Sequence, residues 1–97
     1  MDVPRIELYP GPDERDGWRV ETPYSDAWRE EMKAQVPSRD RRWGHLGKFW
    51  WIAAEHFDLL AYLLIRHFGG YELVDDDTGE ITYVDHEGAR CMQGRLL

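Results

Sequence analysis

The 97-residue sequence is 42% hydrophobic and 32% charged, which is typical of a folded domain with one core and a water-exposed surface. Its formal net charge of −7 disfavours broad contact with a polyanion, because nucleic-acid affinity depends on neutralising phosphates. No apolar run is long enough for a membrane span, and the first residues lack the pattern of a signal peptide. With Cys91 as the single cysteine, no internal disulfide is expected. We predict one cytoplasmic domain over residues 1–97.

The first part of the chain is expected to form two strands and a helix. Pro4–Tyr9 and Trp18–Thr22 alternate apolar and polar residues as half-buried strands do, and a turn-rich loop separates them. A helix should begin near Ser25 or Asp26, either of which can cap its exposed N–H groups, and should end before Pro37. The apolar stripe of this helix consists of Trp28, Met32 and Val36.

A β-hairpin is predicted next. Arg41–Trp43 and Lys48–Ala53 form its arms, because aromatic and β-branched residues there flank a glycine-bounded loop at Gly44–Gly47. Alternation along the second arm gives two faces, one with Lys48, Trp50 and Ile52 and one with Phe49, Trp51 and Ala53. Both faces carry a tryptophan, so one can anchor a core while the other covers something or stays exposed.

A second helix is predicted over Ala54–Phe68, ending at the glycine pair that follows. It has apolar residues on most of its circumference, which indicates burial on several sides or a partner. The stripe assigned to the core consists of Phe57, Leu60, Ala61, Leu64 and Phe68. The second stripe, which would serve either the core or a homodimer, consists of Leu59, Tyr62, Leu63 and Ile65.

The remaining sequence predicts two strands, Tyr71–Val74 and Ile81–Val84, on either side of a turn at Asp75–Glu80. Residues 85–97 are expected to form a tail, in which Ala89–Gln93 could add an edge strand. The order of elements is then ββ-α-ββ-α-ββ. We predict an α+β fold in which a small antiparallel sheet of hairpins is covered on one face by two helices.

The spacing of chemically reactive residues indicates neither catalysis nor a metal site. His56 and His67 lie on one helix about 16 Å apart, too far to share a zinc ion, and His86 with Cys91 lacks further ligands. The acidic turn Asp75–Glu80 has strands, not helices, on its two sides, unlike a calcium-binding EF-hand. No phosphate-binding loop or nucleophile motif is present. We therefore predict a protein that is not an enzyme and needs no cofactor.

The predicted hairpin supports a binding function. Its cationic side chains can contact phosphates, and Trp43 or Trp51 can stack on a base. The alternative is that the tryptophans belong to the core and the cations form weak surface pairs with nearby carboxylates. We predict DNA binding, to single strands or junctions, through five residues: Arg39, Arg41, Arg42, Lys48 and Trp51.

The segment Glu31–Trp43, followed by Lys48–Ile52 and a leucine-rich helix, resembles the HARP-type module that is associated with annealing helicases. Similar segments occur in small bacterial and phage proteins, and the resemblance covers about Tyr24–Phe68. It implies an accessory role in DNA transactions, with Trp43 and Trp50 as structural residues and the basic hairpin near nucleic acid. The sequence holds no helicase motor, so no ATP-driven activity is implied.

An acidic segment supports a different hypothesis. Glu72–Glu87 contains seven Asp or Glu residues and no Lys or Arg. This favours an acidic protein-interaction module, for example a phage-type inhibitor of a host protein. A homodimer through the second stripe of the Ala54–Phe68 helix is a third hypothesis.

Overall fold

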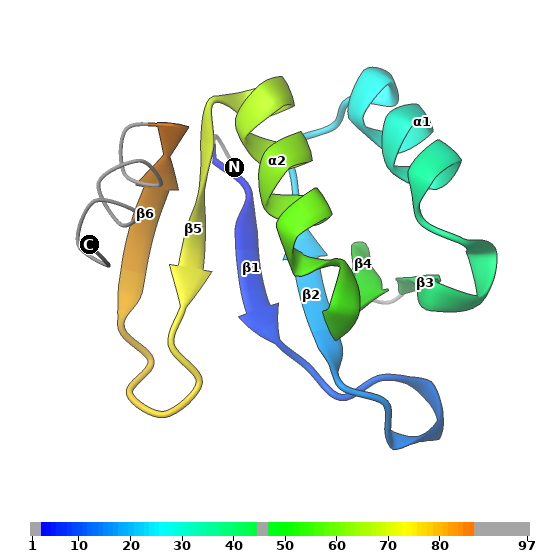
Figure 1. Cartoon of the computed structure of the whole chain (residues 1–97). Helices are drawn as coiled ribbons and strands as arrows, with labels where there is room; N and C mark the ends of the chain where they lie inside the picture. Colours follow the sequence, from blue (N-terminus) through cyan, green and yellow to red (C-terminus); the bar gives the residue numbers. More distant parts are fainter. Residues whose placement is uncertain (1–2, 45–46, 87–97) are drawn as a thin grey trace, which may run out of the picture.

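The computed structural model describes residues 3–44 and 47–86, and the strands in these ranges pair into one six-stranded sheet (Figure 1). The strands are β1 Arg5–Leu8, β2 Gly17–Glu21, β3 Arg41–Gly44, β4 Phe49–Ala53, β5 Gly70–Val74 and β6 Ile81–Asp85. Their order across the sheet is β3-β4-β2-β1-β5-β6. The hairpin β3–β4 therefore forms one edge of the sheet and the hairpin β5–β6 forms the other.

The prediction of an antiparallel sheet is wrong at one pair of strands. β1 and β5 are parallel, with Ile6 opposite Leu73, whereas the other neighbouring strands are antiparallel. The helix α2 (Phe57–Phe68) causes this difference, because it carries the chain from β4 across the sheet to β5. Such a crossover returns the chain in the direction of the strand that it left. The fold is α+β, and strands and helices alternate as ββ-α-ββ-α-ββ, but the sheet is mixed.

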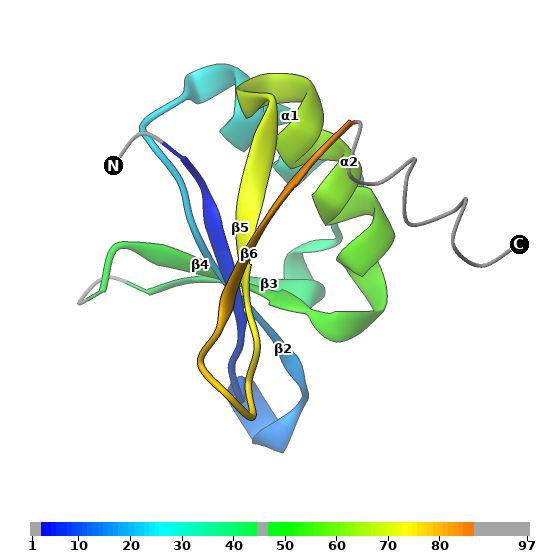
Figure 2. The same cartoon turned by 90° about the vertical axis from the view of Figure 1, so that its left-hand side faces the viewer.

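The helix α1 (Asp26–Gln35) matches its prediction closely. The Ser25 hydroxyl accepts a hydrogen bond from the Trp28 backbone N–H at 3.2 Å, which caps the helix. The predicted stripe of Trp28, Met32 and Val36 is buried. Together α1 and α2 cover one face of the sheet, and we call the opposite face the open face (Figure 2).

The helix α2 is shorter than predicted, because a 3-10 turn at Ala54–His56 precedes it. It ends at Gly69, whose φ of 82° places it in the left-handed region that favours glycine. Leu60, Leu63 and Leu64 are its buried residues. Leu63 was expected in the second stripe but lies in the core. Of that stripe, Tyr62 is exposed, while Leu59 and Ile65 are half-buried.

The core joins both helices to the strands. Its buried residues are Ile6, Val20, Trp28, Met32, Val36, Ile52, Leu60, Leu63, Leu64, Tyr71 and Val84. No helix in the described ranges is both long and apolar enough to cross a bilayer. The predicted edge strand at Ala89–Gln93 lies outside the described residues.

Candidate nucleic-acid interface

The alternation of side chains separates the two consecutive arginines of the hairpin. Arg41 pairs with Ile52 and Arg42 pairs with Trp51 across β3 and β4. Ile52 is fully buried beneath the helices, so Arg41 extends toward the helix-covered face. Arg42 therefore lies on the open face, and the two guanidinium groups cannot form one continuous patch.

The predicted cations differ in how strongly the fold engages them. Arg41 Nε donates a hydrogen bond to the Val36 carbonyl at 3.0 Å, which fixes that side chain. Arg39 is 84% exposed, with Asp40 as its nearest carboxylate at 3.9 Å. Arg42 and Lys48 are exposed, and neither forms an ion pair with another described residue. Of the four cations, these two are the ones that remain available without breaking a contact of the hairpin.

Trp51 is a structural residue of the open face. It is 4% exposed, and its indole Nε1–H donates to the Tyr9 carbonyl at 3.2 Å. A Cβ added at Gly11 or Gly17 would collide with the ring, so the backbone on both sides of the β1–β2 loop packs directly on it. The Arg15 guanidinium lies 5.5 Å from the ring centroid and covers it further. Contacts with other described residues thus cover most of Trp51, which contributes only its remaining 4% exposed surface to any binding site.

The exposed aromatic ring of the hairpin is Trp43, which is 38% exposed. It lies 5.3 Å from Trp50, measured between ring centroids, at a tilt of 58°. Both rings line a cavity of about 530 Å³ between the hairpin and the start of α1. The cavity, which we call the first cavity, is lined by Val20, Thr22, Pro23, Tyr24, Ser25, Trp28, Arg29, Trp43, Lys48 and Trp50. It combines several aromatic rings with two cationic side chains.

The wall that faces Trp43 comes from the start of α1. Tyr24 is 84% exposed, and its hydroxyl donates to Asp26 at 2.8 Å, which raises the pKa of the phenol above its usual value. Arg29 pairs with Asp26 at 2.8 Å through Nη2. Its Nε–H is buried and has no acceptor among the described residues. Among the described residues, Lys48 is therefore the cation of the first cavity that has no carboxylate partner.

The backbone of Lys48 is in an unusual conformation. Its φ of 53° lies in the left-handed region, while its N–H donates to the Gly44 carbonyl at 2.8 Å. A non-glycine residue costs about 1–2 kcal/mol there, because its Cβ crowds the following carbonyl. Asp13 and Glu14 also have positive φ, but they lie in the β1–β2 loop. The turn of the hairpin thus holds a strained lysine at the rim of the cavity.

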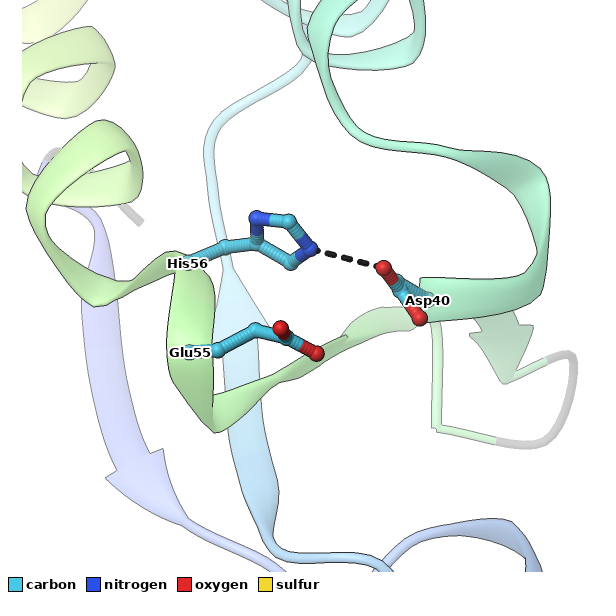
Figure 3. A group of neighbouring side chains, drawn as sticks. All are labelled: Asp40, Glu55 and His56. Carbon is cyan, nitrogen blue, oxygen red and sulfur yellow. Dashed lines mark hydrogen bonds and ion pairs between the residues drawn. The ribbon is translucent and has the colours of Figure 1, made fainter.

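A buried carboxylate anchors the start of β3. Asp40 is 5% exposed, and His56 Nε2 lies 2.9 Å from its Oδ2 (Figure 3). Arg15 Nη2 lies 2.9 Å from its Oδ1. Hydrogen bonds from His56 and then from Arg15 hold the pKa of Asp40 below its usual range. These contacts tie the turn before β3 to the β1–β2 loop and to the turn before α2.

The same cluster has the composition of a metal site but not its chemistry. Potential ligand atoms of Asp40, Glu55 and His56 lie within 4.8 Å of one another. Arg15 already lies among them, 2.9 Å from Asp40 and 3.5 Å from Glu55. A cation would have to displace this guanidinium, and each Asp40 oxygen already has a hydrogen-bond partner. We interpret the cluster as an internal ion-pair network.

Sequence reasoning missed the wall that α1 contributes. Tyr24 and Arg29 were not named as binding residues, because their proximity to Trp43 depends on how α1 packs on the sheet. The one available signal was an aromatic residue immediately before a helix cap. Sequence reasoning also missed the Asp40–His56 contact, because 16 positions separate the two residues and only the packing of the chain brings them together.

Comparison of the chain with protein-family models, with curated proteins and with solved structures found no match. The resemblance to the HARP-type module therefore stays a prediction from the residues.

Proposed function

We propose that this protein binds single-stranded DNA, without catalysis, at the surface formed by the β3–β4 hairpin and the start of α1. The observation that carries the proposal is the first cavity, where Trp43 and Tyr24 present exposed rings beside the unpaired Lys48. Planar rings stack on bases and an ammonium group binds phosphate. A nucleotide offers both partners in one ligand.

The shape of the site favours a single strand over a duplex. The cavity of about 530 Å³ has the size of a small-molecule pocket. Aromatic rings line it on the side of the hairpin and on the side of α1. A base inside a duplex is stacked on its neighbours and cannot enter such a site without being extruded. An unpaired base can enter at little cost.

The largest acidic turn among the described residues lies away from this surface, although the Asp26 carboxylate lies beside Tyr24 and Arg29. The acidic turn at Asp75–Glu80 joins β5 and β6, which lie at the sheet edge opposite β3. Six strands in this order separate the two edges by about 24 Å at the usual strand spacing. This distance exceeds the Debye length of about 8 Å at physiological salt, so the repulsion that reaches the hairpin is weak.

Affinity for a fluorescently labelled oligothymidylate, measured by anisotropy across a salt series, tests the proposal. We expect Trp43→Ala to weaken binding about fivefold or more, because one stacked base contributes about 1–3 kcal/mol. Lys48→Gln should reduce the slope of log K against log salt by about 0.7, the value for one phosphate contact on a single strand.

Two matched variants control for nonspecific effects. Tyr62→Ala removes an exposed aromatic ring on α2, and Lys33→Gln removes an exposed lysine at the far end of α1. Neither should change the affinity or its salt dependence. Absence of binding at low salt, or an equal loss in Tyr62→Ala and Trp43→Ala, would contradict the proposed function.

A further inference from the structure

A second cavity lies on the other side of β3. It has a volume of about 240 Å³ and occupies the open face, between the hairpin and the loop that follows β1. Its lining includes Tyr9, Pro10, Pro12, Arg42, Trp43 and Phe49. Trp43 lines both cavities, so the two are separated by little more than this strand.

The strand between the cavities is open to a ligand. β3 pairs with β4 on one side, and no other described segment pairs with it on the other. It has four residues, and Arg42 and Trp43 at its centre are both exposed. A flexible chain that leaves the first cavity can therefore cross β3 without displacing an element of the described structure.

The alternation of side chains also gives each cavity one cation that forms no ion pair with another described residue. Lys48 lines the first cavity and Arg42 lines the second. Two other guanidinium groups near the second cavity are engaged. Arg15 lies over Trp51 and pairs with Asp40 at 2.9 Å. Arg19 lies 4.2 Å from the Phe49 ring centroid and 2.8 Å from a Glu21 oxygen. Arg19 also pairs with Glu7 at 3.7 Å, so its single charge is already shared between two carboxylates. Arg42 remains the group that can receive a phosphate.

We infer that a bound single strand continues from the first cavity across the edge of β3 into the second cavity, where Arg42 binds a phosphate of the same strand. This inference rests on the proposed function and adds a second subsite to it. The aromatic rings of Tyr9 and Phe49 meet edge to face at 5.4 Å and provide the apolar wall there. Each cavity has its own cation and aromatic wall on its own side of β3, so binding should strengthen when the ligand is long enough to fill both.

Affinity for oligothymidylates of increasing length, from one to about sixteen nucleotides, tests the inference and extends to the upper end of the site sizes of about 4–16 nucleotides known for single-strand binders. In the wild-type protein we expect a step in affinity once both subsites are filled. Arg42→Gln should remove most of this step and reduce the salt slope by about 0.7. Arg39→Gln is the matched control, because Arg39 is exposed, adjoins the same strand and lines neither cavity.

The possible results separate the inference from the proposed function. If Arg42→Gln leaves the length dependence and the salt slope unchanged while Trp43→Ala still weakens binding, the second subsite is refuted and the first cavity retains its function. If Arg39→Gln and Arg42→Gln act equally, the path across β3 is also refuted, because nonspecific charge explains both. If no oligonucleotide binds, the proposed function itself fails.

Discussion

The two hairpins at opposite edges of the sheet are stabilised in different ways. The β5–β6 hairpin closes through its own turn, where the Asp75 carboxylate accepts hydrogen bonds from the N–H groups of Asp77 at 2.8 Å and Thr78 at 3.1 Å. Gly79 supplies the left-handed residue of this turn, with φ of 74°. Nothing outside the turn is needed for these contacts.

The β3–β4 hairpin is instead held by segments that are distant in sequence. Asp40 binds Arg15 and His56 at its start, and Trp51 lies beneath the β1–β2 loop. Its turn makes no comparable local network among the described residues, and the left-handed position is occupied by Lys48. A hairpin that is secured by tertiary contacts can accommodate strain at its turn, and here the strained residue presents its charge to the candidate site.

The largest expected effect comes from removing the tryptophan that anchors the first hairpin. Trp51→Ala should lower the free energy of unfolding by about 3–5 kcal/mol, because it leaves a cavity under the β1–β2 loop and removes the bond to Tyr9. Tyr83→Ala, in the second hairpin, should cost about 1 kcal/mol or less, since Tyr83 is exposed. Urea denaturation measures both values. Equal losses in the two variants would show that tertiary anchoring does not distinguish the hairpins.

A smaller effect should appear in acid. The pKa of Asp40 is lowered by hydrogen bonds from His56 and Arg15, and the pKa of Asp75 is lowered by the backbone N–H groups of Thr78 and Asp77. Each carboxylate therefore stabilises the fold above its ordinary pKa of about 3.8, and this stability is lost as the pH falls through the lowered folded value.

Asp40→Asn and Asp75→Asn should both flatten the acid limb of a plot of urea midpoint against pH. At neutral pH we expect the greater loss of stability in Asp40→Asn, because Asp40 joins three segments whereas Asp75 closes a single turn. Glu55→Gln is the control, as its exposed carboxylate lies 3.5 Å from the same Arg15. A steeper acid limb in Asp40→Asn would contradict the direction of its pKa shift.

The features that depend on local contacts could be predicted from the sequence, and those that depend on contacts between distant segments could not. The β5–β6 strands and their turn were predicted because glycine and aspartate at fixed offsets act locally. The capped helix α1 was predicted for the same reason. The parallel pairing of β1 with β5 was not, because it depends on where α2 returns the chain. Local signals thus identify the elements but do not determine how all of them pair.

The candidate site was predicted in part. Arg42 and Lys48, two of the predicted binding residues, line the two cavities, and the period-two alternation of β3 could have separated Arg41 from Arg42 in advance. The burial of Trp51 could not have been foreseen, since it requires the β1–β2 loop to fold back over the open face.

The smallest expected effect concerns the turns themselves. Lys48→Gly should raise the free energy of unfolding by about 0.5–1 kcal/mol, because relief of the left-handed strain exceeds the entropy that glycine adds to the unfolded chain. Gly79→Ala should lower it by a similar amount, although a Cβ there meets no atom within 4 Å. Opposite signs in the two turns would confirm that the first hairpin accepts strain that the second avoids.

Lys48→Ala completes the comparison, because it removes the charge and leaves the backbone strain in place. DNA affinity should fall equally in Lys48→Ala and Lys48→Gly, while stability should rise in the glycine variant alone. That pattern would show that Lys48 destabilises the turn but contributes to DNA binding. If Lys48→Gly is instead no more stable than the wild type, the left-handed backbone is not costly, and the strain gives no support to a functional role for Lys48.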